Sequence, residues 1–354
     1  MVLFDFNIFF LQKYGGISRY IIELCKQMDA NKDEYFIHSL IHQNEQLNKK
    51  RLNKSFNICL KTYPRFTRKL INSINKFFLY QYANTSNFKI LHNTYYGNYT
   101  FKKKMTQICS VYDFTHEIFS EIYNYNIDIK KKALSNTNHF ICISENTKKD
   151  LINFYKIKEE LISVVYLGGN HLPKPTHKFN HKPFILYVGY RENYKNFDNL
   201  LDAFSLSKIL KKDFNIVCFG GSGFNNSEIK KIKDKGLTDF VKHVDGDDQL
   251  LSNLYSSASC HVITSKYEGF GLTAIEAFNF NCPVIHTGQG SLKEIANTNG
   301  FYDGSSENLS FLLEKNIYSP DILKEMIYQG KLLSKNFTWE NCYRDTMKVY
   351  KNFT

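Results

Sequence analysis

The sequence predicts an α/β protein built from two Rossmann-like domains. Short apolar runs alternate with longer amphipathic segments along the 354 residues, a pattern typical of β-α-β units and a parallel sheet. The alternation stops once, at residues 169–182, where two prolines stand in a segment without periodicity. It then starts again. The length is also that of two domains of ordinary size.

The first half of the chain predicts an N-terminal domain at residues 1–168. Its strand candidates are short apolar runs, and they are Val2–Phe9, Phe36–Ile41, Lys89–His92, Gln107–Tyr112, His139–Ile143 and Ser163–Leu167. Helical patterns stand between them, for example at Ile17–Met28 and Thr147–Phe154. Residues 169–182 then read as a linker.

The second half predicts a C-terminal domain at residues 183–338 and a last helix at 339–354. The strand candidates are Phe184–Val188, Asn215–Phe219, Val241–Val244, Cys260–Thr264 and Pro283–His286. The chain ends in two helical patterns, Ile322–Leu333 and Trp339–Asn352. In open α/β sheets, ligands bind beyond the carboxyl ends of the strands, so we expect a site in a cleft between those ends.

Composition favours a cytoplasmic protein that meets anions. The net charge of +12 attracts nucleotides, nucleic acids or acidic membranes without choosing among them. No apolar run reaches the ~18–20 residues that span a bilayer, and the start of the chain lacks a basic leader. The eight cysteines are scattered, which indicates reduced core thiols rather than disulfides or zinc ligands.

The strongest motif is the segment 267–277, which reads YEGFGLTAIEA and follows the run Cys260–Thr264. It predicts a strand, a glycine loop and a helix whose free N–H groups favour a phosphate. The residues that would line this loop are Gly269, Phe270, Gly271, Leu272 and Thr273. Glu268 and Glu276 could hold hydroxyls at both ends of a sugar diphosphate. The alternative is a tight turn flanked by two structural carboxylates.

Two further glycine turns stand at strand-to-helix positions. Gly189 ends the run Phe184–Val188, and Arg191 and Lys195 follow on the loop. Two cations there suit a diphosphate, although two solvated loop charges remain the alternative. Gly15 and Gly16 lie between the first strand candidate and the first helix, where a phosphate approach and a plain turn are equally compatible with the sequence.

Together these motifs resemble glycosyltransferase family 4, the retaining enzymes of the GT-B fold. Glu268 and Glu276 match its E-x7-E signature, and the turns at 15–16 and 188–196 match its glycine loop and its diphosphate site. Further matching blocks are ISENTKKDL at 143–151, VYLG at 165–168, residues 250–258 and FTWE at 337–340. Residues 45–88 match least. The resemblance implies two Rossmann-like domains facing across a cleft, an acceptor site on the first domain, and a last helix that crosses back to it.

The resemblance also implies a role for each motif. Arg191 and Lys195 would neutralise the departing diphosphate. Glu276 would bind the ribose, and Glu268 with the amides of Gly269–Gly271 would hold the donor sugar. Gly16 would let the backbone approach the phosphates. The base would lie near the turn 220–223 and the residues His243 and Val244. A front-face route, in which a donor phosphate oxygen accepts the acceptor's proton, requires no protein general base.

The sequence departs from the family pattern at one place. Many members have a histidine before the aspartate at the exit of the fourth strand, whereas this chain has Tyr112 before Asp113. His116 follows one helical turn later. Asp113 and His116 therefore either bind sugar or acceptor hydroxyls or only cap the next helix, and the sequence leaves both alternatives open.

The resulting expectation is a retaining hexosyltransferase that acts on a nucleotide sugar and a glycan or lipid-linked acceptor in surface polysaccharide synthesis. The resemblance to O-antigen and capsule transferases makes GDP-mannose the first donor to test. A sugar-nucleotide epimerase of the same fold and a basic nucleic-acid-binding protein are the alternatives, but no nucleic-acid motif is present, so we expect no nucleic acid as a partner.

Two other patterns bear on cofactors and membranes. Asp245 and Asp247 form a D-x-D, but Asp247 precedes a helical pattern at Gln249–Ser256 and predicts an N-cap rather than a metal ligand, so we expect no metal. The segment Tyr63–Tyr80 is basic and aromatic at helical spacing. It either packs as an ordinary helix or lies on an anionic membrane, which would place the protein at the inner membrane face.

Overall fold

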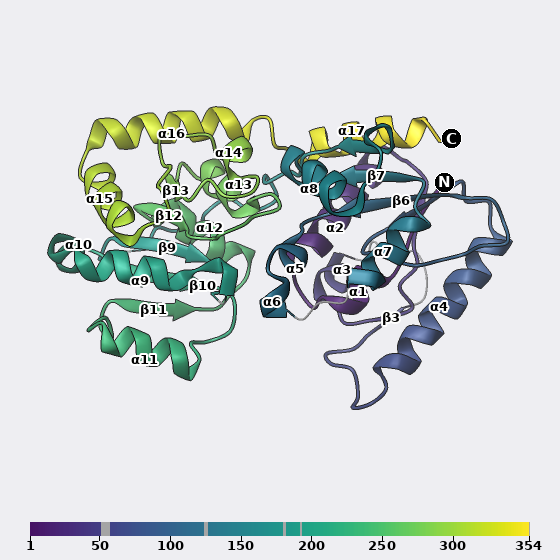
Figure 1. Ribbon diagram of the computed structural model, residues 1–354, viewed down its shortest axis with the longest axis horizontal. Coiled ribbons are helices and arrows are strands. Elements are labelled where there is room, and N and C mark those ends of the chain that lie inside the picture. Colours follow the sequence, from purple (N-terminus) through teal and green to yellow (C-terminus); the bar gives the residue numbers. More distant parts are fainter. Residues whose placement is uncertain (51–56, 124–126, 180–181, 192, 354) are drawn as a thin grey trace. The chain divides into compact units, whose positions relative to one another are not determined.

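The computed structural model describes residues 1–50, 57–123, 127–179, 182–191 and 193–353. It consists of two compact units (Figure 1). The first contains Met1–Gly168 and Trp339–Thr354, and the second contains Gly169–Thr338. Of the segment 169–182 that we predicted as a linker, residues 180 and 181 lie outside the described residues.

The first unit is built on a parallel sheet with the strand order β2-β1-β5-β6-β7-β8. The strands are β1 (Val2–Phe4), β2 (Tyr35–Ile37), β5 (Ile90–Asn93), β6 (Thr106–Val111), β7 (His139–Cys142) and β8 (Ile162–Val164). Most of their residues are buried, as expected of a parallel sheet covered on both faces. Two short strands, β3 (Ile41–His42) and β4 (Ile58–Cys59), pair separately.

The helices of this unit connect the strands (Figure 1). They are α1 (Asn7–Leu11), α2 (Gly16–Ala30), α3 (Glu45–Lys50), α4 (Arg68–Thr85), α5 (Thr115–Ile118), α6 (Ser120–Tyr123), α7 (Ile127–Ser135) and α8 (Glu145–Tyr155). The last helix, α17 (Trp339–Lys351), belongs to this unit and packs on α2. Its Trp339 is buried and stacks on Tyr20 with the ring centroids 6.4 Å apart.

The predicted strand Val2–Phe9 was wrong in its second half. The strand ends at Phe4, and α1 begins at Asn7. The buried Asp5 carboxylate accepts hydrogen bonds from the backbone N–H of Thr94 (2.8 Å) and the Tyr99 hydroxyl (2.8 Å), which turns the chain at this point. Ile8, Phe9 and Phe10 are buried on α1, and a short apolar run cannot by periodicity alone be assigned to a strand or a buried helix.

The second unit contains a parallel sheet with the order β11-β10-β9-β12-β13. The strands are β9 (Phe184–Val188), β10 (Asn215–Phe219), β11 (Val241–Val244), β12 (Cys260–Ile263) and β13 (Val284–His286). The helices are α9 (Phe197–Leu206), α10 (Lys208–Asp213), α11 (Asn226–Asp234), α12 (Asp248–Ser257), α13 (Leu272–Asn279), α14 (Leu292–Ile295), α15 (Ser306–Ile317) and α16 (Pro320–Ser334). The prediction of an α/β fold with two Rossmann-like units is confirmed.

All eight cysteines are free thiols, and all but Cys59 are buried. Within the described part of the chain, each helix is either too short or too polar to cross a bilayer.

Candidate active site

The carboxyl ends of β9, β10 and β12 lie side by side in the second unit, and a glycine-bearing turn follows each strand. Gly189 and Gly220 have φ angles of +112° and +74°, which residues other than glycine rarely adopt. A Cβ added at Gly189, Gly220 or Gly223 would meet no atom of the described residues within 4 Å. These turns therefore leave open space directly over the backbone, where a ligand can approach closely.

Lys195 and Glu268 form an ion pair at this edge of the sheet. Lys195 is the last residue of the short η2 helix (Asn193–Lys195), and Glu268 lies on the loop after β12. The Lys195 Nζ is 2.5 Å from Glu268 Oε1. The Ser265 hydroxyl donates to the same oxygen at 2.6 Å. Burial alone would lower the pKa of Lys195, but the Glu268 carboxylate and Tyr194 raise it above its usual value. Lys195 is thus a fixed cation that stays charged, and its side chain is still 23% exposed.

The position of Lys195 depends on residues that sequence analysis did not single out. The Thr264 hydroxyl donates to the Lys195 carbonyl at 2.7 Å, and the Lys266 N–H donates to the Tyr194 carbonyl at 2.7 Å. These bonds join the loop after β9 to the exit of β12. Their sequence signal is weak, because a threonine at a strand end is common in any α/β protein.

The loop after β13 forms hydrogen bonds to the glycine loop before α13 and packs closely against it. Ser291 donates from its N–H (2.9 Å) and its hydroxyl (3.0 Å) to the Glu268 carbonyl. A Cβ at Gly290 would lie 2.3 Å from that carbonyl oxygen, so only glycine fits there. Gly271 is the N-cap of α13 with a φ of +91°. The loop predicted at 269–271 and the helix that starts at Leu272 are confirmed.

Glu276 lies inside α13 and is buried. One carboxylate oxygen accepts a hydrogen bond from the Tyr255 hydroxyl at 3.0 Å, and the other lies 3.1 Å from His171 Nε2. Its two partners come from α12 and from the segment predicted as the linker. The structure therefore holds this carboxylate in one orientation, and its role toward a ribose stays a prediction.

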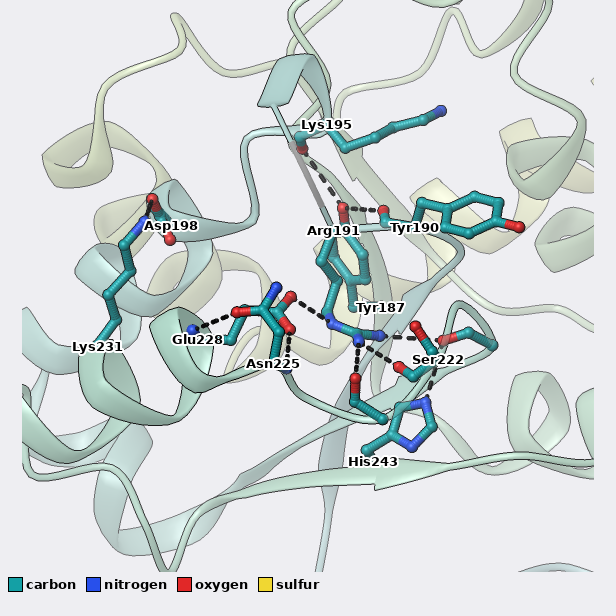
Figure 2. A network of polar contacts seen from close by, with 12 residues as sticks. Tyr187, Tyr190, Arg191, Lys195, Asp198, Ser222, Asn225, Glu228, Lys231 and His243 are labelled. Carbon is teal, nitrogen blue, oxygen red and sulfur yellow. Dashed lines mark hydrogen bonds and ion pairs between the residues drawn. The ribbon is translucent and has the colours of Figure 1, made fainter.

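Arg191 is not the solvated loop charge that the sequence left as an alternative, and its role toward a diphosphate stays a prediction. Its side chain is only 3% exposed, and its Nε lies 2.9 Å from Glu228 Oε1. The guanidinium also donates to the carbonyls of Gly220 (3.0 Å), Ser222 and Gly223 (3.3 Å) (Figure 2). The short loop after β9 brings Arg191 over the next strand, where backbone carbonyls and a carboxylate surround it.

The residues proposed for base binding lie beside this network. His243, on β11, approaches the Gly220 carbonyl at 3.1 Å through Nε2, and its ring packs edge-on against Phe224. Val244 ends the same strand. Asp247 accepts from the Leu250 N–H at 3.0 Å and is the N-cap of α12, as predicted.

In the first unit, the predicted glycine loop lies at the start of α2. Gly16 is the first residue of α2, and Gly15 is its N-cap in an extended conformation. The Gln12 side chain accepts a hydrogen bond from the Ser18 N–H at 3.2 Å, so one N-terminal amide of this helix already has a partner. The predicted approach to a phosphate stays a prediction.

The residues in place of the family histidine have structural partners. The Tyr112 hydroxyl is buried and donates to the Thr94 carbonyl at 2.8 Å. Asp113 accepts from the N–H of Thr115, the first residue of α5, at 3.0 Å, but the N-cap of this helix is Phe114, which makes no side-chain cap hydrogen bond. His116 lies within α5, where its ring packs edge-on against Tyr123. A contact of Asp113 or His116 with substrate stays a prediction.

Comparison with known proteins identifies both halves of the chain. The family model described as Glycosyltransferase Family 4 matches residues 14–170, and the model described as Glycosyl transferases group 1 matches residues 170–332. O-antigen chain mannosyltransferase B of Escherichia coli is 22% identical over 238 residues. That match covers 62% of this chain and 62% of the relative, less than two thirds of its length.

Solved structures of the same fold cover nearly the whole chain. Sucrose-phosphate synthase from Thermosynechococcus elongatus gives a TM-score of 0.80 at 17% identity and covers 99% of this chain and 98% of that one. Anabaena HepE in complex with UDP and glucose gives 0.74 at 14% identity, with 99% of both chains covered. These likenesses establish the GT-B fold class, and the two family models show that the chain is a glycosyltransferase with a family 4 domain followed by a group 1 domain.

Proposed function

We propose that this chain transfers a sugar, with retention of its anomeric configuration, from a nucleotide-diphosphate sugar to a glycan or lipid-linked glycan acceptor. The observation that carries this proposal is the glycine-lined strand edge of the second unit, where Lys195 and Glu268 are paired beside open space over Gly189 and Gly220. A close backbone approach, a fixed cation and a helix N-terminus are the parts that a sugar diphosphate requires.

The proposed chemistry centres on the leaving group. As the glycosidic bond to phosphate breaks, negative charge grows on the departing diphosphate while the sugar becomes oxocarbenium-like. Lys195 and the amides at the start of α13 would stabilise that charge more in the transition state than in the ground state. Glu268 would orient Lys195 and accept a hydrogen bond from a sugar hydroxyl. A phosphate oxygen of the donor would take the acceptor's proton, so no protein general base is required.

The donor that we propose is GDP-mannose. The relative from Escherichia coli is named a mannosyltransferase, and its match extends through 62% of the chain. The relative of known structure that binds UDP makes UDP-sugars the second class to test. No metal enters the proposed mechanism, because Lys195 and the helix amides carry the charge of the diphosphate.

We further propose that α4 brings the protein to an anionic membrane surface, where a lipid-linked acceptor would lie. Ile71, Asn75, Leu79 and Ala83 form the buried face of α4, so the helix is packed on its own unit. Exposed apolar residues are Leu70, Phe77 and Phe78 on α4 and Phe66 just before it, which are 63%, 57%, 47% and 90% exposed. Arg65 and Lys69 are exposed beside them. Exposed aromatics flanked by cations suit the boundary between lipid headgroups and acyl chains.

A thermal-shift screen of GDP-, UDP- and ADP-sugars tests the proposed donor class. A ligand present at 100 times its Kd adds about 2.7 kcal/mol to the free energy of unfolding, which raises the melting temperature measurably. We expect one base class, with GDP first, to stabilise the protein in both its sugar-linked and free diphosphate forms. If no nucleotide of any class stabilises it, the proposal is wrong. A product that is an altered nucleotide sugar without a new glycosidic bond would favour the epimerase alternative.

A further inference from the structure

The Arg191 guanidinium joins three pieces of the second unit. It leaves the turn after β9, contacts the carbonyls of Gly220 and Gly223 in the turn after β10, and pairs with Glu228 in the first turn of α11 (Figure 2). It also lies 4.9 Å from the centroid of the Phe224 ring, over its face. Because these contacts come from different turns, Arg191 fixes the shape of the turn 220–223.

Glu228 serves both Arg191 and the start of α11. Its Oε1 pairs with Arg191, and its Oε2 accepts the Asn225 N–H at 2.8 Å. The Glu228 N–H in turn donates to Asn225 Oδ1 at 2.9 Å, which completes a capping box. The Glu228 side chain is 12% exposed, so moving Arg191 toward a ligand would leave a largely buried carboxylate without its cation.

The turn that Arg191 holds is tightly fitted on one side and open on the other. A Cβ at Gly221 would lie 2.9 Å from the Gly189 carbonyl oxygen and 3.2 Å from an Arg191 nitrogen. Gly220 and Gly223, in contrast, would gain a Cβ without meeting any described atom within 4 Å. The guanidinium is thus on the packed side of the turn, behind the surface that faces open space.

Lys195, in contrast to Arg191, is partly exposed and lies outside this network of carbonyls. Its side chain extends away from the Arg191 guanidinium (Figure 2), pairs with Glu268 and is 23% exposed against 3% for Arg191. A cation can stabilise a leaving group only if it reaches the developing charge. Burial and partners therefore separate the two cations into different roles.

We infer that Arg191 is a positioning residue, which acts through Glu228 to hold the turn 220–223 as a nucleotide-binding surface, and that Lys195 rather than Arg191 meets the charge of the leaving diphosphate. This inference rests on the proposed function for the identity of the ligand. The planar fork of arginine reaches a carboxylate and several carbonyls at once, which lysine cannot reproduce.

Four variants test this inference: Arg191→Ala, Arg191→Lys, Glu228→Gln and the double variant Arg191→Ala/Glu228→Gln. The matched control is Asp198→Asn, which breaks an exposed ion pair with Lys231 on the same helix α11. The measurements are Kd for GDP, UDP and ADP by titration calorimetry, kcat at saturating donor, and amide hydrogen exchange of residues 219–226.

We expect each single variant at Arg191 or Glu228 to weaken binding of the preferred nucleoside diphosphate about tenfold, with kcat within about threefold of wild type. The double variant should be no weaker than the singles, because both act through one contact. Exchange at 219–226 should rise in these variants and stay unchanged in Asp198→Asn.

Two results would overturn the inference. The first is a fall in kcat of about a hundredfold in Arg191→Ala with unchanged Kd and unchanged exchange, which would make Arg191 a leaving-group cation. The second is near-wild-type binding and exchange in Glu228→Gln. If wild type bound none of the three nucleotides, the proposed function would be wrong, whereas the exchange measurement would still decide whether Arg191 holds the turn.

Discussion

Lys195 is the residue on which the proposed chemistry depends most. It is a cation held by the Glu268 carboxylate, with its pKa raised above the usual value, on an edge that leaves room for a ligand. We expect Lys195→Ala to lower kcat about 100-fold, a loss of about 2.7 kcal/mol of transition-state stabilisation. Steady-state kinetics with the identified donor checks this value. Lys231→Ala, at an exposed ion pair on α11, is the matched control, and equal kcat in both variants would remove Lys195 from the mechanism.

Buried histidines predict how stability depends on pH. Burial lowers the pKa of His261 and His286 to about 4, below the value of about 6.5 in an unfolded chain. The folded state therefore keeps them neutral while the unfolded state binds protons, so stability is lost as pH falls from about 6.5 toward 4. Each histidine should remove about 2 kcal/mol by pH 5.

The first unit contains an opposing group. Burial lowers the pKa of His92 to about 3, but burial also raises the pKa of Asp5 to about 6, and that carboxyl regains stability as pH falls through 6 toward 4. Burial also lowers the pKa of His38, His42 and His139 in this unit, so both units should lose stability as pH falls from 7 to 5. Urea titrations at pH 7 and pH 5 can follow the first unit by the fluorescence of Trp339, the chain's single tryptophan, and the whole chain by circular dichroism.

A substitution at His261 tests the assignment. Its Nδ1 lies 3.1 Å from the Leu186 carbonyl, and the amide of an asparagine can supply a donor there without binding a proton. His261→Asn should show a smaller loss of stability between pH 7 and pH 5 than wild type. An equal loss in both proteins would mean that other groups cause the acid sensitivity.

At the scale of single elements, α4 gives a separate prediction. Replacing Arg65, Arg68 and Lys69 with Glu should abolish sedimentation with anionic liposomes, and raising the salt concentration should weaken binding of wild type. The matched control reverses three exposed lysines of the second unit, Lys208, Lys230 and Lys233. Equal sedimentation of the α4 variant and wild type would leave α4 as a packed helix only.

The sequence predicted the strands of the second unit better than those of the first. The strands β9, β10 and β11 have the predicted bounds, and each is followed directly by a glycine or an aspartate that marks its end. The run Val2–Phe9 failed since its apolar residues continue without a break from β1 into the buried helix α1. The run Phe36–Ile41 is divided between β2 and β3, because the chain passes here from the six-stranded sheet to the two-stranded one.

The candidate site was predictable in its loops but not in its contacts. Glycines between a strand and a helix indicate a close backbone approach, and the loop before α13 was found in this way. That Arg191 lies against the turn after β10, and Lys195 against Glu268, depends on which strands are neighbours in the sheet. The order β10-β9-β12 brings together turns that are distant in the sequence, and no local pattern encodes that order.

At the scale of the whole molecule, each of the two units has its own parallel sheet, and the last helix returns to the first unit. The lysine–glutamate pair, the open glycines and the Arg191 network all belong to the second unit. Asp113, His116 and α4 belong to the first. We therefore expect nucleotide binding to depend on the second unit and acceptor and membrane binding to depend on the first.

Sugar transfer itself is the most direct test of the central claim. Wild type and Lys195→Ala would be incubated with the donor found by the thermal screen and a lipid-linked or glycan acceptor, with EDTA present, and the products followed by NMR. We predict release of a nucleoside diphosphate together with a new glycosidic bond of the donor's own anomeric configuration, at a rate about 100-fold lower in the variant. Complete loss of wild-type transfer in EDTA, an inverted product, or undiminished transfer by Lys195→Ala would contradict the account.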